Sequence, residues 1–313
     1  MNTDFIEFKK KRELGDILSD TFAFLRSQFK PFFNVFLKIV GPYLAVMAIS
    51  YGFYTYSIGD LVNFTGDNFD FPLTTILTLV VVMVFFFSII AAYVMAQATT
   101  LFYIKSYTDL KGNIDFDTIK KNVYGSFWKF VGLAFLVGLS VGIGFMFCLV
   151  PGIYLYVPLA LSFSIMVFRQ KGTSEAYSDS FGLVKDEWWM AFATLFIVGI
   201  IVTIASYAFS MPSTIYAFMK LGILSGEIDA TDFTGNLFDP IAVILGIISL
   251  LAQFFLSIIS LVASALIYFN LNEKKNFTGT YERIQDLGKK PEEETSTFDR
   301  IQNLGKGPED QTN

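Results

Sequence analysis

The chain has 313 residues, of which 53% are hydrophobic and only 16% are charged, whereas roughly 25% of a typical soluble domain is charged. This composition excludes a disordered protein, argues against a soluble enzyme and is typical of a polytopic membrane protein. Histidine is absent, which removes the commonest general base and most zinc sites, and the net charge of −5 gives no support to nucleic-acid binding.

Residues 1–30 are expected to form a cytoplasmic N-terminus that contains an amphipathic helix. Leu14, Leu18, Phe22 and Leu25 follow one another at intervals of three or four residues, so they share one face of a helix. Such a helix beside a membrane span tends to lie in the membrane interface. It either only anchors the span that follows or also serves as a docking surface for a partner or a lipid.

Residues 31–272 are predicted to form a membrane domain. A helix needs about 20 apolar residues to cross the hydrocarbon core, and six stretches are long enough. They run approximately from Phe32 to Tyr56, Leu73 to Tyr103, Phe130 to Leu149, Gly152 to Phe168, Trp189 to Phe209 and Ile241 to Tyr268. Pro212 is expected to kink or end the fifth span. The predicted fold is therefore an all-α integral membrane protein with six transmembrane helices arranged as three hairpins.

An internal repeat precedes two of these hairpins. Ser19, Asp20 and Phe22 recur as Ser178, Asp179 and Phe181, and Phe29 corresponds to Trp188. The repeat predicts a second interfacial helix near residues 174–187, with Phe181 and Trp188 on its membrane face. A weaker third copy lies near residues 116–128. The chain is thus expected to contain three units, each a cytoplasmic amphipathic helix followed by a hairpin.

Polar residues inside the spans are candidates for function because they are costly in lipid. Lys38 either extends to the headgroups or contacts a buried partner or lipid phosphate. Gln97 and Gln253 are expected to form hydrogen bonds between helices, and the alternative is a polar pathway for a solute. The pattern from Gly138 to Gly142 is predicted to let two helices approach closely rather than to make Ser140 a nucleophile. No catalytic, cofactor-binding or metal-binding residue is predicted.

Residues 273–313 are predicted to form a polar cytoplasmic tail with a duplicated short motif. The motif places an aromatic residue, Ile and Leu at helical spacing before a glycine, which predicts a helix of about two turns that ends at Gly288 or Gly305. The candidate docking residues are Tyr281, Ile284 and Leu287 in the first copy and Phe298, Ile301 and Leu304 in the second. The alternatives are a duplication without function, or packing of the first copy against the protein's own helices.

Lysine and arginine concentrate in the first 30 residues, in the loops after the second and fourth spans, and in the tail. Acidic residues dominate the loops on the other side, with Lys220 as the single basic candidate there. Because cytoplasmic loops carry an excess of Lys and Arg, both termini are expected to be cytoplasmic.

Three stretches resemble a broad group of bacterial six-span proteins, similar to the membrane domain of some glycerophosphodiester phosphodiesterases. They are Leu14-Gly-Asp-Ile-Leu-Ser-Asp-Thr-Phe22, Val150-Pro-Gly-Ile-Tyr-Leu155 and Ala176-Tyr-Ser-Asp-Ser-Phe-Gly-Leu-Val184. The resemblance implies the bacterial cytoplasmic membrane but not the enzyme activity, since the catalytic barrel and histidine are missing.

The expected function is that of a non-enzymatic accessory or scaffold protein without a cofactor. It would contact the lipid bilayer and a cytoplasmic or membrane protein partner. The alternative is a transporter or lipid-handling protein.

Overall fold

The computed structural model describes residues 5–62, 73–220 and 239–288, and within these ranges the chain is helical and contains no strand. Six helices are long and apolar enough to cross a membrane, which identifies a multi-pass membrane protein. They are α2 (Phe29–Val62), α3 (Leu73–Asp109), α4 (Phe116–Phe147), α5 (Leu149–Phe168), α7 (Trp188–Lys220) and α8 (Pro240–Asn276). The shorter helices are α1 (Leu14–Ser27), α6 (Thr173–Val184) and α9 (Thr278–Gly288).

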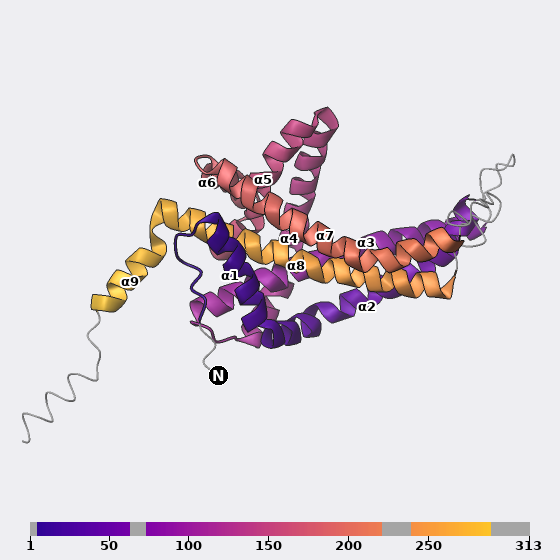
Figure 1. The fold of residues 1–313 in the computed structure, drawn as a ribbon, viewed down its shortest axis with the longest axis horizontal. Coiled ribbons are helices and arrows are strands. Elements are labelled where there is room, and N and C mark those ends of the chain that lie inside the picture. Colours follow the sequence, from indigo (N-terminus) through magenta and orange to yellow (C-terminus); the bar gives the residue numbers. More distant parts are fainter. Residues whose placement is uncertain (1–4, 63–72, 221–238, 289–313) are drawn as a thin grey trace, which may run out of the picture.

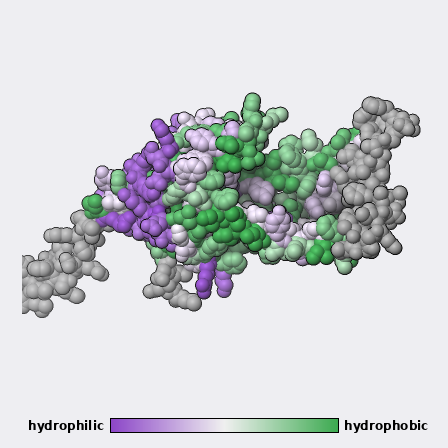
Figure 2. Space-filling model, turned by 45° about the horizontal axis from the view of Figure 1, so that its top comes forward, coloured by the Kyte–Doolittle hydropathy of each residue, from purple (hydrophilic) through white to green (hydrophobic). Residues whose placement is uncertain are grey.

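Helices α2, α3, α7 and α8 form one long bundle (Figure 1). α2 packs on α3, α7 packs on α8, and α8 also contacts α2 and α3. Large side chains such as Phe36, Met95 and Phe254 fill the core. Hydrophilic surface gathers at the end of the molecule where α9 leaves α8, and hydrophobic surface covers most of the rest (Figure 2). We call this hydrophilic end, where α1 and α9 also lie, the charged end.

Two helix boundaries differ from the sequence prediction. The interfacial helix expected near residues 116–128 is not a separate element, because α4 continues without a break from Phe116 to Phe147. Of the two outcomes expected for Pro212, a kink or an end of the helix, the second is wrong, since α7 continues to Lys220. A proline removes a single backbone hydrogen bond, and long membrane helices tolerate that loss.

The chain contains two equivalent units, α1–α3 and α6–α8. α1 begins fifteen residues before α2 (Leu14 and Phe29), and α6 begins fifteen residues before α7 (Thr173 and Trp188). α3 and α8 each have 37 residues. The α4–α5 hairpin lies between the two units in the sequence and projects from the side of the long bundle (Figure 1). The two units therefore build the bundle, and the hairpin is an addition to it.

Candidate functional site

The repeated aspartates, Asp20 in α1 and Asp179 in α6, each stand at the same position of their helix and each hold two basic side chains. The basic residues precede the aspartate by ten and by eight positions in both copies. The pairs are Lys10 Nζ–Asp20 at 3.0 Å, Arg12 Nε–Asp20 at 2.8 Å, Arg169 Nη1–Asp179 at 3.5 Å and Lys171 Nζ–Asp179 at 2.6 Å. The sequence repeat is thus also a repeat of ion pairs that fixes the chain entering each unit.

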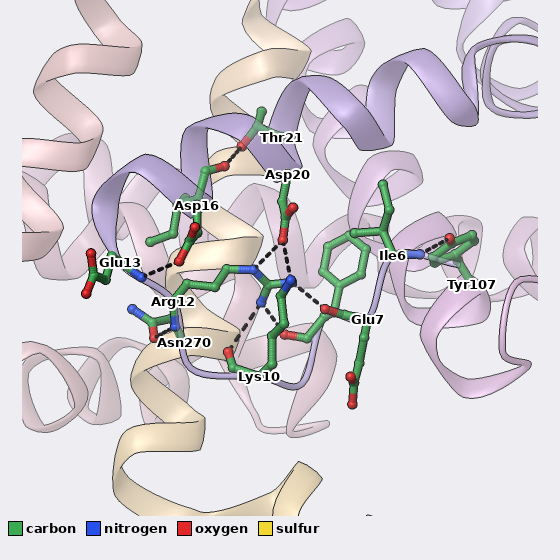
Figure 3. A network of polar contacts seen from close by, with 12 residues as sticks. Ile6, Glu7, Lys10, Arg12, Glu13, Asp16, Asp20, Thr21, Tyr107 and Asn270 are labelled. Carbon is green, nitrogen blue, oxygen red and sulfur yellow. Dashed lines mark hydrogen bonds and ion pairs between the residues drawn. The ribbon is translucent and has the colours of Figure 1, made fainter. Parts of the chain in front are cut away.

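The first cluster is buried around Arg12, whose side chain is 0% exposed (Figure 3). Its guanidinium donates to the backbone oxygens of Phe8, at 2.7 Å, and Glu7, in addition to Asp20. Its backbone N–H donates to Asn270 Oδ1 of α8 at 2.8 Å. Burial alone would raise the pKa of Asp20, but the hydrogen bonds from Arg12 and Lys10 outweigh it and hold that pKa below its usual value. The network ties the N-terminal segment to α1 and α8.

Glu273, near the end of α8, holds the start of α9. Its carboxylate accepts hydrogen bonds from the backbone N–H groups of Gly279 at 2.7 Å and Thr280 at 3.0 Å, and from the Thr280 hydroxyl at 2.7 Å. These N–H groups lack partners within their own helix, so a carboxylate at this position stabilises the helix start. α9 is therefore anchored to α8 at its first turn.

The tail residues expected to dock a partner are placed only in part. α9 is described as far as Gly288, the glycine expected to cap it. Tyr281 is 65% exposed and Ile284 is 60% exposed, so the described helices leave most of both side chains uncovered. The side chain of Leu287 and the second copy, with Phe298, Ile301 and Leu304, lie outside what the structure describes.

The predicted interfacial face of α1 lies beside its buried face. Ile17, Thr21 and Phe24 point into the protein and are buried. The predicted face turns outward, with Phe22 exposed and Leu14, Leu18 and Leu25 half-buried; Phe181 and Trp188 of the second copy are also half-buried. The sequence pattern therefore located a partly exposed apolar stripe but not the residues that hold the helix to the bundle.

The three polar residues predicted within the spans lie apart from one another. Lys38 Nζ lies 5.3 Å from the centre of the Phe116 ring, so the lysine links α2 to α4. Gln97 is half-buried and Gln253 is exposed, and neither side chain forms a hydrogen bond with another residue of the described ranges. The described cavities are lined by other residues.

A basic cavity of about 250 Å³ lies between α3, α4 and the turn from α5 to α6. Three lysines from three different elements line it, Lys105, Lys129 and Lys171, and no carboxylate is among its lining residues. Asn122, Ser126 and Gln170 add neutral hydrogen-bonding groups, and Phe102, Phe130, Met166 and Val167 add apolar walls. We call it the lysine pocket. Its chemistry suits a small anion.

The positions of the lysines are fixed by their neighbours. Lys105 Nζ donates to the backbone oxygen of Val167 at 3.2 Å, which holds α3 against α5. Lys171 is held by Asp179 of the repeated ion-pair cluster. A neighbouring cavity of about 340 Å³ shares Lys105 but contains Asp109 and Arg169, and Arg169 is already bonded to Asn272. The lysine pocket differs from it in having no carboxylate among its lining residues.

The chain matches no protein-family profile, no curated protein and no solved structure. Sequence reasoning missed the buried Arg12 and the lysine pocket. Extending the repeat ten residues upstream reveals the first, because Lys10-Lys-Arg12 and Arg169-Gln-Lys171 stand at equal distances from Asp20 and Asp179. The pocket has no local signal, since its lysines are contributed by three separate segments.

Proposed function

We propose that this chain is a non-enzymatic integral membrane protein that binds the phosphate groups of anionic lipids at its cytoplasmic face. The lysine pocket carries the proposal, because three lysines and neutral donors line it and no carboxylate is among its lining residues, with Lys171 paired to Asp179 outside the pocket. In the orientation expected from the distribution of Lys and Arg, the charged end and both termini face the cytoplasm. The sequence resemblance favours the bacterial cytoplasmic membrane.

The location of the pocket favours a lipid over a soluble ligand. Its apolar walls, Phe102 and Phe130, belong to helices that are apolar enough to cross a membrane. Trp128, beside Lys129, is exposed, and tryptophan is enriched at the membrane–water interface. Basic pockets between membrane helices on the cytoplasmic side are typical sites for anionic headgroups. Such a pocket would hold the phosphate while the acyl chains remain in the bilayer.

Lipid titration tests this function. In phosphatidylcholine nanodiscs, Lys129→Gln should weaken the binding of pyrene-labelled phosphatidylglycerol about fivefold, because one lysine near an anionic lipid surface contributes about 1 kcal/mol. Lys121→Gln is the matched control. It removes the same charge from the same helix at an exposed position outside the pocket, so it should leave the affinity nearly unchanged.

Two results would contradict lipid binding. Equal affinities of the Lys129 and Lys121 variants would mean that only general surface charge attracts the lipid. If inorganic phosphate displaces the labelled lipid at micromolar concentration, the pocket is a site for a soluble anion instead. Phosphatidylcholine carrying the same pyrene label measures binding that is independent of headgroup charge.

A second function, docking of a cytoplasmic partner, is favoured by α9. The anchoring of this helix by Glu273 leaves Tyr281 and Ile284 exposed, with most of both side chains uncovered by the described part of the chain. A photo-crosslinking amino acid at Ile284 should therefore capture a discrete protein in native membranes. The same group at Gln285, exposed at the next position along the helix, should capture much less of it. Equal capture at the two positions would contradict docking through this face.

A further inference from the structure

The α4–α5 hairpin has an apolar turn. No charged residue stands between Lys129 and Arg169. At the turn, Met146 is 90% exposed, Phe147 is 84% exposed and Val150 is 71% exposed. In contrast, the segments that join α2 to α3 and α7 to α8 contain several acidic residues. A hairpin turn with so much exposed apolar surface is suited to hydrocarbon and not to water.

Helix α6 packs along α5 and α4. Tyr177 of α6 forms a hydrogen bond of 2.9 Å with Ser140 of α4, well along the hairpin. The 12 residues of α6 extend about 18 Å, more than half of the roughly 30 Å of α5. α6 also carries Glu175 and Asp179. If α5 crossed the membrane, this charged helix would lie beside it in the hydrocarbon, where ionised side chains are costly.

The C-terminal end of α6 also contacts the charged end of the molecule. At the α6–α7 junction, Glu187 pairs with Lys274 at 2.8 Å and Asp186 pairs with Lys275 at 3.2 Å, both at the end of α8. The next residue, Trp188, donates its indole N–H to the backbone oxygen of Tyr154 at 3.3 Å. Tyr154 lies in the second turn of α5, close to the turn of the hairpin. Both ends of α5 therefore lie beside segments of the charged end.

We infer that the α4–α5 hairpin inserts into the cytoplasmic leaflet and turns within it, without crossing the membrane. The acyl chains of that leaflet cover its exposed apolar turn. Four helices then cross the bilayer, α2, α3, α7 and α8, and they are the four that form the long bundle (Figure 1). The side of both termini is unchanged, because a hairpin that does not cross replaces one that crosses twice. The inference uses the proposed orientation but not lipid binding in the lysine pocket.

Cys148, the single cysteine, stands at the turn and is exposed, so it is a natural probe. An impermeant maleimide should modify it neither in right-side-out nor in inside-out vesicles, but should modify it after detergent is added. In a Cys148→Ser background, Tyr154→Cys should react in inside-out vesicles only. That variant keeps the backbone oxygen that Trp188 contacts. If the hairpin crossed the membrane instead, Cys148 and Tyr154→Cys should both react in right-side-out vesicles.

Two controls in the Cys148→Ser background define the sides. Lys185→Cys marks the charged end and Lys220→Cys marks the opposite end of the bundle. Bimane attached to Cys148 should be quenched by brominated acyl chains more strongly than by aqueous iodide. Modification of either hairpin position from the side of Lys220→Cys overturns the inference. Three other results would also overturn it: reaction of Cys148 in inside-out vesicles, failure of Tyr154→Cys to react in those vesicles, or stronger quenching by iodide than by brominated acyl chains.

Discussion

Replacing Asp20 by asparagine should destabilise the folded protein by on the order of 3 kcal/mol, the range for breaking a buried ion pair. The Arg12 side chain is 0% exposed, and the substitution leaves its charge without its anionic partner (Figure 3). The change is best measured as thermal unfolding followed by circular dichroism in a fixed detergent.

Asp179→Asn is the matched control, because the repeat places it at the equivalent position of α6. Its partners Arg169 and Lys171 are 26% and 37% exposed, so water can solvate them when the carboxylate is lost. Ion pairs that water can reach contribute about 0–1 kcal/mol, so Asp179→Asn should cost less stability than Asp20→Asn. Equal losses for the two variants would show that burial of Arg12 does not control the stability of the N-terminal segment.

The pH dependence of the same pair provides an independent check. Because the pKa of Asp20 is lowered in the folded protein, its stabilising effect is fully present above the unfolded carboxyl value of about 3.9. The effect is lost as the pH falls through the lower folded value. The difference in stability between the native chain and Asp20→Asn should therefore be largest near neutral pH and shrink on acidification. A difference that does not depend on pH would mean that the loss is not electrostatic.

The sequence predicts most of the helices because apolar stretches of membrane-spanning length are a strong signal. It also identifies Asp20 and Asp179 as equivalent, since the repeat is visible in the residues. It does not reveal how α4 and α5 are placed relative to the membrane. Hydropathy depends on the length and polarity of a segment but not on whether that segment crosses the bilayer. The packing of α6 along α5 is a tertiary contact. Only the structure shows that α6, which carries charged residues, packs against the apolar helix α5.

The spacing of glycines likewise fails to predict a tertiary contact from the sequence. The pattern from Gly138 to Gly142 predicts a close helix–helix contact, but a Cβ added at either glycine meets nothing within 4 Å. Ser140 between them pairs with Tyr177, so the segment faces α6 through a hydrogen bond. The close approach lies near the hairpin turn instead, between Gly144 and Gly152. A short glycine motif indicates that a helix can pack closely against another, but it does not show where the partner helix lies.

Gly144→Ala should therefore destabilise the α4–α5 hairpin by about 2 kcal/mol, as is typical of overpacking. The new Cβ would lie 2.9 Å from the Cα of Gly152, and backbone atoms cannot move aside as a flexible side chain can. Gly138→Ala is the matched control on the same helix. It meets open space and should stabilise α4 slightly, because alanine favours a helix over glycine by up to about 1 kcal/mol.

Thermal unfolding of the two variants in the same detergent measures the difference, and reactivity of Cys148 locates it. Cys148 lies between the two helices that Gly144→Ala would force apart. In bilayers, loosening of the turn should make Cys148 more reactive toward a membrane-permeable maleimide in Gly144→Ala but not in Gly138→Ala. If the two alanine variants unfold at the same temperature, the Gly144–Gly152 contact does not hold the hairpin together.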